Sequence, residues 1–187
     1  MKNGKVCSEC KKRSSLSYII SCGVYAHPLL QETIKQWKFG ASFDITYFLG
    51  ELMQKTIREN YFYEWLEKYQ PILIPIPIHK RKLNIRGFNQ TEALANFLSE
   101  YNGLKVCSNV LLKVKNTRPQ TSIPHNKRWQ NIKNSYQIKN PSLVEGKNIL
   151  LVDDVVTTGA TLKHATYLLK KAGAKNISAV TLAFGNP

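Results

Sequence analysis

Two adjacent acids, Asp153 and Asp154, directly follow an apolar run at residues 148–152. The run predicts a strand buried on both faces, as in a parallel sheet, and ligands bind beyond the carboxyl ends of such strands. A hydroxyl-rich turn then enters a helical pattern, and the backbone N–H groups at a helix start form a cradle for phosphate. Since carboxylates accept hydrogen bonds from ribose hydroxyls, the pattern indicates a sugar phosphate site. Its expected members beside the acids are Thr157, Thr158, Gly159 and Thr161.

Three other interpretations of the acid pair explain less. A magnesium-binding strand of a P-loop NTPase requires an upstream G-x-x-x-x-G-K-[ST] string, which this chain lacks. Response-regulator receivers carry paired acids near the start of their domain, whereas this pair stands close to the end of the chain. Acids that merely end a buried strand would leave the three threonines and the glycine of the following turn unexplained.

The charge balance also indicates an anionic ligand. Twenty-seven Lys and Arg against twelve Asp and Glu give a net charge of +15, and such a surplus attracts nucleic acid or phosphorylated molecules. Two segments, residues 71–91 and 101–144, contain no acid at all, and we expect their cations to form an anion-binding surface. The cations, which in the first segment cluster with His79, are Lys80, Arg81, Lys82, Arg86, Lys105, Lys113, Lys115, Arg118, Lys127, Arg128, Lys133 and Lys139.

Cys7 and Cys10 have the C-x-x-C spacing that brings two thiolates to one tetrahedral zinc ion. The chain has no second such pair, so a zinc site would need Cys22, His27 or a partner chain to complete it. Cys107 is expected to be a small buried apolar residue.

Hydrophobic periodicity predicts alternating strands and helices. Asn89 and Glu92 are spaced as a capping box at the start of one helix. Residues 115–136 form a long, basic, polar segment, which is typical of a lid or binding loop. We expect strands at 17–25, 72–78, 110–114, 148–152 and 177–183, and helices at 29–37, 45–57, 65–69, 89–101 and 161–172.

The chain of 187 residues is long enough for one domain with a real core. No apolar run is long enough to span a membrane, and no secretory signal is recognisable, so we expect a cytoplasmic protein.

Residues 149–161 resemble the phosphoribosyl pyrophosphate (PRPP) motif of type I phosphoribosyltransferases. Residues 75–79 with Arg81, residues 86–90, and residues 118–120 with Arg128 and Asn131 resemble the signature of the ComF/GntX branch. The resemblance covers residues 18–183 and implies an α/β fold, type I phosphoribosyltransferase-like, with a mostly parallel sheet flanked by helices. It divides the chain into residues 1–16, which match part of a four-cysteine zinc ribbon at Cys7 and Cys10, and a phosphoribosyltransferase-like domain at 17–187.

The resemblance implies a role for each part of the site. Asp153 and Asp154 would bind the ribose hydroxyls and act as the catalytic residues. Thr157, Thr158, Gly159, Ala160 and Thr161 would hold the 5′-phosphate, and Val155 would also belong to the PRPP site. The turn with Pro77, His79 and Arg81 would meet the pyrophosphate and its Mg²⁺. The basic segment from Lys115 would close over the site as a hood.

The ComF branch implies natural transformation and handling of incoming single-stranded DNA, with a DNA-uptake or helicase protein as partner. Arg118, Lys127, Arg128 and Lys133 would contact the DNA, and Trp129 and Tyr136 could stack its bases. The alternative is an active phosphoribosyltransferase with an unidentified base. Oxopurine enzymes usually have an Asp where Thr157 stands, which argues against a 6-oxopurine acceptor.

Overall fold

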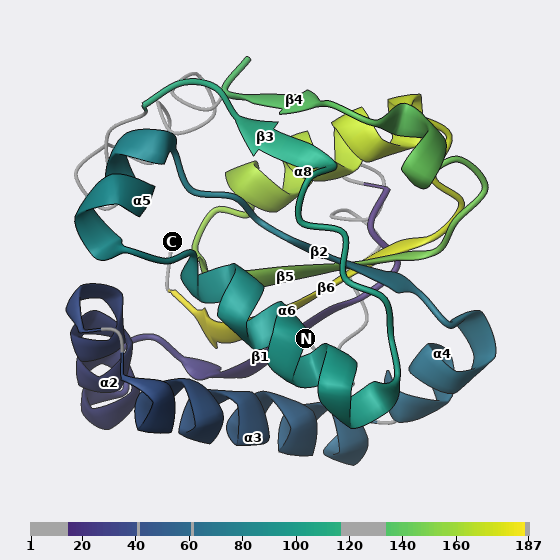
Figure 1. Ribbon diagram of the computed structural model, residues 1–187. Coiled ribbons are helices and arrows are strands. Elements are labelled where there is room, and N and C mark those ends of the chain that lie inside the picture. Colours follow the sequence, from purple (N-terminus) through teal and green to yellow (C-terminus); the bar gives the residue numbers. More distant parts are fainter. Residues whose placement is uncertain (1–14, 41, 61, 117–133, 186–187) are drawn as a thin grey trace.

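A four-stranded parallel sheet lies at the centre of the computed structural model, which describes residues 15–40, 42–60, 62–116 and 134–185 (Figure 1). The strand order is β1-β6-β5-β2, and all three neighbouring pairs are parallel. The α/β fold expected from the sequence is confirmed. The strands are β1 (Ile19–Val24), β2 (Ile72–Pro75), β5 (Ile149–Val156) and β6 (Ile177–Phe184).

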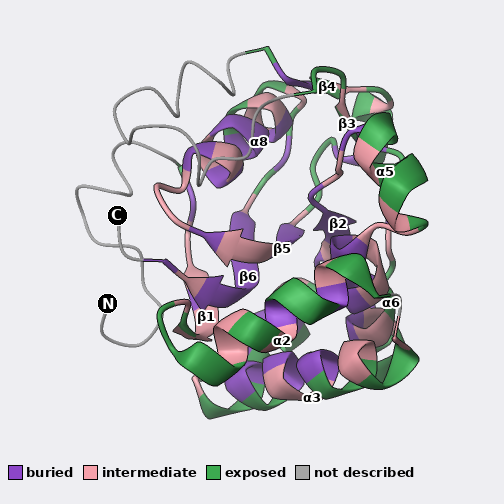
Figure 2. Cartoon of the chain, turned by 90° about the vertical axis from the view of Figure 1, so that its left-hand side faces the viewer, coloured by how far each residue is buried: buried purple, intermediate pink, exposed green. Residues whose placement is uncertain are grey.

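Helices cover both faces of the sheet, as Figures 1 and 2 show. One face carries α2 (Pro28–Phe39), α3 (Phe43–Glu59), α4 (Phe62–Tyr69) and α6 (Gln90–Asn102). The other carries α8 (Ala160–Lys171) and the antiparallel pair β3 (Leu111–Lys113) and β4 (Tyr136–Ile138). Two short helices complete the described chain, α5 (Lys80–Arg86) and the 3₁₀ turn η3 (Pro141–Leu143).

Strand β5 explains why two cores form. Successive residues of a strand point to opposite faces, so Ile149 and Leu151 pack against α8, while Leu150 and Val152 pack against α3 and α6. All four side chains are fully buried. Burial of an apolar side chain of this size contributes roughly 1.5–3 kcal/mol to stability. The four buried residues therefore hold β5 between the two cores, and this fixes the position of the two acids that follow them in the strand.

Several elements differ from expectation. β5 continues through both acids to Val156, because β6 pairs with it along this length and sets Asp153 opposite Thr181. β2 ends at Pro75; it is the last strand of the sheet, where prolines such as Pro75 and Pro77 are tolerated although they lack the N–H needed to extend a ladder. The predicted capping box is wrong: Asn89 stands at the N-cap of α6 but does not cap it, and its Oδ1 accepts instead from the Thr91 hydroxyl at 3.0 Å. α5 and β4 were not predicted.

No helix within the described ranges is both long enough and apolar enough to cross a bilayer.

Candidate functional site

The two acids lie at the end of the sheet where the parallel strands finish, the end that faces the viewer in Figure 2. The backbone N–H of Asp154 donates to Asp153 Oδ1 at 2.9 Å, and the N–H of Val155 donates to Asp154 Oδ1 at 2.6 Å. Each carboxylate is thus held by the peptide that follows it. Asp153 is buried, while the Asp154 side chain keeps about a fifth of its surface exposed, 21%.

Lys38, in the last turn of α2, forms an ion pair with the second acid. Its Nζ lies 2.5 Å from Asp154 Oδ2. Burial alone would raise the pKa of Asp154, but the Lys38 ammonium lowers it below its ordinary value. Burial and the neighbouring Asp154 raise the pKa of Asp153 well above its ordinary value. The pair is therefore asymmetric, with Asp154 the more readily ionised carboxylate.

Three further cations act on the acid pair, Lys82 and Arg86 from α5 and Lys113 from β3. Burial and, to a smaller extent, the positive charge of Lys82 lower the pKa of Lys113 to about 8, although Asp153 and Asp154 oppose the shift. Burial also lowers the pKa of Lys82, which Asp154 partly offsets. Four cations thus share two acids, and the site has a surplus of positive charge suited to an anionic ligand.

The threonine turn enters α8 through Gly159, whose φ of 71° lies in the left-handed region that favours glycine. Gly159 is the N-cap and offers no side chain to the first helical turn. Thr158 Oγ1 accepts from the N–H of Ala160 at 3.3 Å. Thr157, Thr158, Gly159 and Thr161 are all half-buried, so the turn can be reached from solvent. The phosphate cradle expected in this turn stays a prediction.

The turn after β2 holds a helix start rather than an open loop. His79 is the N-cap of α5, and its Nδ1 accepts from the backbone N–H of Arg81 at 3.2 Å. Burial lowers the pKa of His79, and the charges of Arg81 and Lys80 lower it further, so the ring stays neutral. The Arg81 side chain is exposed, and Pro77 is half-buried ahead of the helix. On α5, Lys82 and Arg86 are the cations that act on Asp154.

Lys38 is the one cation of the site that sequence reasoning missed entirely. It lies outside both acid-free segments, and its contact joins positions far apart in the chain, so no local pattern indicates it. Lys82 and Lys113 were singled out only as members of those segments, and Arg86 also as part of the signature at residues 86–90.

Tyr136 does not offer a stacking surface for bases. It is 3% exposed, forms a hydrogen bond with Thr161, and its ring centroid lies 6.1 Å from that of His164 on α8. Its ring stabilises the contact between β4 and α8, because burial of an apolar ring removes it from water. The other hood and DNA candidates, Arg118, Lys127, Arg128, Trp129 and Lys133, lie outside the described residues.

Cys7 and Cys10 also lie outside the described residues, so the zinc site stays a prediction. Cys22 lies in β1, where burial raises the pKa of its thiol to about 11. Cys107 is buried in the core, as expected. Within the described ranges, no three His, Cys, Asp or Glu side chains gather as metal ligands.

The parallel sheet, with paired acids ending one strand and a threonine turn entering the next helix, defines a type I phosphoribosyltransferase-like protein. The family model described as "Phosphoribosyl transferase domain" matches residues 93–186. Within this class, the chain belongs to the ComF family.

Relatives of known name support that assignment. The chain is 32% identical to Competence protein F of Haemophilus influenzae over 95% of this chain and 77% of that protein. It is 30% identical to Competence protein ComFC of Bacillus subtilis over 95% of this chain and 71% of that protein. It is 29% identical to DNA utilization protein YhgH of Escherichia coli K12 over 90% of this chain and 73% of that protein. A solved structure described as the allosteric regulatory enzyme of purine biosynthesis aligns at TM-score 0.40 and 20% identity, over 59% of this chain and 21% of that one.

Proposed function

We propose that this protein binds PRPP, or a related phosphoribosyl compound, at the end of β5 and supports natural transformation by handling incoming single-stranded DNA in the cytoplasm. One observation carries the binding proposal: two carboxylates and a threonine-lined helix start lie at one end of the sheet, and four cations act on the two carboxylates. The carboxylates suit the hydroxyls of a ribose, and the helix start suits its 5′-phosphate.

Each group has a distinct part in such a complex. Asp154 would accept a hydrogen bond from one ribose hydroxyl, and the protonatable Asp153 would contact the other. The hydroxyls and backbone N–H groups of residues 157–161 would hold the phosphate. Lys82, Arg86 and Lys113 would balance the charge of the pyrophosphate. If turnover occurs, these fixed charges would stabilise the pyrophosphate as it leaves.

The donor chemistry of the site fits magnesium. Asp153 and Asp154 are the hard oxygen ligands that Mg²⁺ prefers, and Mg²⁺ commonly binds through one or two carboxylates together with substrate phosphates. When bound, the ion would neutralise part of the pyrophosphate charge.

The role in transformation is supported by the names of the relatives, Competence protein F, Competence protein ComFC and DNA utilization protein YhgH. The cation-rich segment at 115–139 supplies charge for a nucleic acid backbone. The second candidate is an active phosphoribosyltransferase, favoured by the family match. Thr157 still argues against a 6-oxopurine as its acceptor. For the DNA role, a DNA-uptake or helicase protein is the expected partner.

Isothermal titration with PRPP and Mg²⁺ tests the binding proposal. Wild type should bind, and Asp154→Asn should weaken binding by about tenfold or more, because a charge-assisted hydrogen bond contributes roughly 1.5–3 kcal/mol. Glu67→Gln is the control, since Glu67 is exposed on α4, which leads into the start of β2 and therefore lies toward the other end of the sheet. Equal affinity in wild type and Asp154→Asn would refute the assignment.

The DNA role and the enzyme role are separated by two further measurements. Fluorescence anisotropy with a labelled single-stranded oligonucleotide should show binding that weakens with salt and is lost when Lys127 and Arg128 are both replaced by Glu. Release of pyrophosphate from PRPP in the presence of a nucleobase would favour the enzyme. If the chain binds no DNA and its deletion leaves transformation intact, the uptake role must be abandoned.

A further inference from the structure

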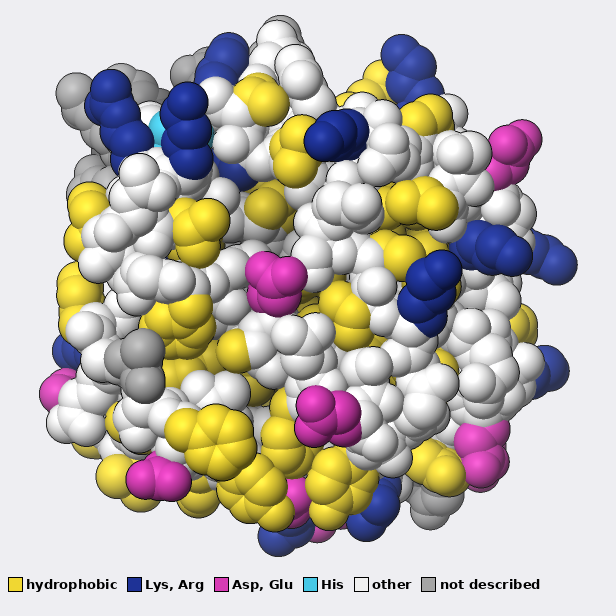
Figure 3. Space-filling view, in the orientation of Figure 1, with side chains coloured by type: hydrophobic (Ala, Val, Ile, Leu, Met, Phe, Trp, Pro, Cys, Tyr) yellow, Lys and Arg dark blue, Asp and Glu magenta, His cyan; other side chains and the backbone are white. Residues whose placement is uncertain are grey.

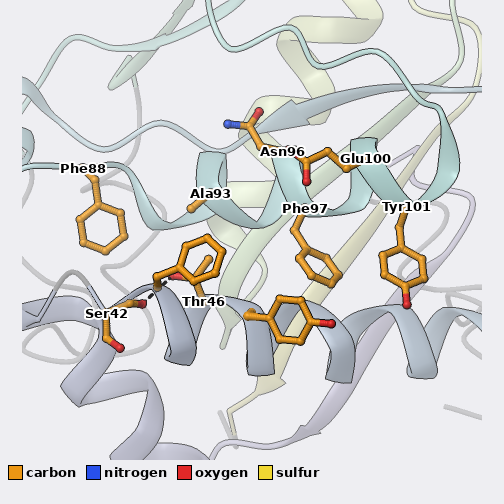
Figure 4. Close-up of a pocket in the computed structure, with 10 residues that line it drawn as sticks. Ser42, Thr46, Phe88, Ala93, Asn96, Phe97, Glu100 and Tyr101 are labelled. Carbon is orange, nitrogen blue, oxygen red and sulfur yellow. Dashed lines mark hydrogen bonds between the residues drawn. The ribbon is translucent and has the colours of Figure 1, made fainter.

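A groove lies between α3 and α6, on a face of the molecule that the phosphoribosyl site does not use. It encloses about 470 Å³. Figure 4 shows Phe88, Phe97 and Tyr101 of its wall directed into the space between the helices. Two more aromatic residues line it from α3: Phe43 is 80% exposed and Tyr47 is 51% exposed. Exposed aromatic side chains at a concave surface are typical of a protein-binding site.

The aromatic rings of the groove are already arranged by contacts with one another. Phe97 lies edge-on to Tyr47 at 5.5 Å between centroids and stacks on Tyr101 at 5.4 Å. Gly50 of α3 permits this arrangement, because a Cβ at that position would lie 2.5 Å from the Phe97 ring. The wall is therefore preorganised, which lowers the entropic cost of binding a partner.

The two helices that border the groove are acidic in a strongly basic protein, and one of their acids, Glu100, lines the groove itself. Helices α3 and α6 together carry five of the chain's twelve acids, but only two of its twenty-seven Lys and Arg. In Figure 3, acidic and hydrophobic side chains share the centre and lower half of this face, while most Lys and Arg lie along its upper and right-hand margins. The acids are Asp44, Glu51, Glu59, Glu92 and Glu100.

One ring of the groove, that of Tyr101 on α6, already takes a cation from the facing helix α3. The Arg58 guanidinium lies 5.6 Å from the centroid of the Tyr101 ring. A hydrogen bond with Glu51 and the charge of that acid raise the pKa of Tyr101, which keeps its hydroxyl protonated. Glu51 Oε1 is buried and has no hydrogen-bond partner among the described residues. The groove thus combines aromatic faces that attract cations with carboxylates that accept from them.

We propose that the α3–α6 groove binds a segment of a partner protein that carries Lys or Arg beside apolar side chains. Charge complementarity decides the class of occupant. Helices α3 and α6 carry five acids against two cations, which disfavours nucleic acid, while the rest of a chain with net charge +15 disfavours a cationic segment. A basic, amphipathic segment therefore has one favourable place on this face. This interaction is independent of the phosphoribosyl site.

A fluorescein-labelled amphipathic peptide, with Lys and Arg on one helical face and Leu on the other, serves as the probe. Anisotropy should show binding to the full chain that weakens with salt. Phe43→Ser and Glu100→Lys should each reduce the affinity by about tenfold. Tyr167→Ser is the matched control, because Tyr167 is 60% exposed on α8, across the sheet, and should leave the affinity unchanged.

The outcomes decide the proposal. Circular dichroism first establishes that the variants fold, as the high exposure of Phe43 and Glu100 leads us to expect. Failure of the cationic peptide to bind, or equal binding of a peptide with Glu in place of Lys and Arg, overturns it. So does an equal loss in Tyr167→Ser. If sedimentation shows a dimer of this chain that Phe43→Ser dissociates, a second copy covers the groove and the proposal is wrong.

Discussion

At the scale of single residues, the site is defined by how charge is compensated. A buried carboxylate is costly unless it is paired or hydrogen-bonded. Asp154 has both kinds of partner, the Val155 N–H and the Lys38 ammonium. Asp153 has the Asp154 N–H but no ion pair among the described residues, and its pKa is raised, by burial first and by Asp154 second. Lys38 therefore determines which acid carries the charge.

Lys38→Met should destabilise the protein. It removes the cation that compensates Asp154, and we expect the free energy of unfolding to fall by about 1–3 kcal/mol. This is less than for a fully buried ion pair, because the Lys38 and Asp154 side chains keep 22% and 21% of their surface exposed. Urea denaturation measures the change. Lys35→Met is the control: its Nζ lies 3.9 Å from Glu32 on an exposed surface, and its effect should stay within about 0.5 kcal/mol.

A double variant shows whether the effect comes from the ion pair. In an Asp154→Asn background the carboxylate is gone, so Lys38→Met should cost clearly less than it does in wild type. Equal costs in the two backgrounds would mean that Lys38 stabilises α2 for another reason.

Lys113 should make ligand binding depend on pH. Its pKa of about 8, lowered mainly by burial, means that its charge is lost as the pH rises through that value. The affinity for PRPP should therefore fall by up to about tenfold from about pH 7 to about pH 9. The effect on stability has the opposite sign: the unfolded chain keeps the proton to higher pH, so the contribution of Lys113 to the free energy of unfolding rises above pH 8.

Titration calorimetry at several pH values checks the dependence. Lys113→Met should bind more weakly at neutral pH and lose most of the slope, whereas Lys105→Met, at an exposed position, should keep it. An unchanged slope in Lys113→Met would assign the pH dependence to another group.

At the scale of elements, periodicity identified most of the fold. α3 and α8 present apolar stripes long enough to recognise, and β5 and β6 are continuous apolar runs. α5 escaped prediction because its seven residues include no buried side chain and so leave no apolar stripe. β4 escaped because it has three residues and exists through its pairing with β3. Sequence thus predicts elements that bury a face, while elements stabilised by a distant neighbour stay hidden.

The same distinction holds for the candidate site. The acids and the threonine turn are contiguous in sequence and could be recognised together. The cations reach them from α2, α5 and β3, and only the fold brings Lys38 and Lys113 to the same place.

Gly50→Ala should destabilise the α3–α6 contact. Alanine favours a helix over glycine by about 1 kcal/mol, but here its Cβ would lie 2.5 Å from the Phe97 ring, and such overpacking costs typically about 1–3 kcal/mol. Urea denaturation should show a net loss. In a Phe97→Ala background the obstruction is absent, and Gly50→Ala should become neutral or stabilising. If Gly50→Ala stabilised the otherwise wild-type protein, the close contact between Gly50 and the Phe97 ring would be contradicted.

At the scale of the whole molecule, opposite charges occupy different regions. The end of the sheet gathers cations around two acids, whereas α3 and α6 gather acids in a chain of net charge +15. Segregated charge sets up fields that steer different ligands to different surfaces. An anionic phosphoribosyl compound at one place and a cationic protein segment at the other could then be bound at the same time.

The charge distribution also predicts how magnesium enters. Free Mg²⁺ meets the net positive charge of the molecule and four cations beside Asp153 and Asp154, and Lys38 already occupies Asp154. Mg²⁺ alone should therefore give no saturable heat in calorimetry, while PRPP should bind more tightly as Mg²⁺ is added and lose that gain when the metal is chelated. Lys38→Met removes one competing cation and should be the variant in which weak binding of Mg²⁺ alone first becomes measurable. We therefore infer that Mg²⁺ enters the site together with the phosphate groups of PRPP. Stoichiometric binding of Mg²⁺ alone to wild type would contradict this inference, because the two acids would then form a metal site without PRPP.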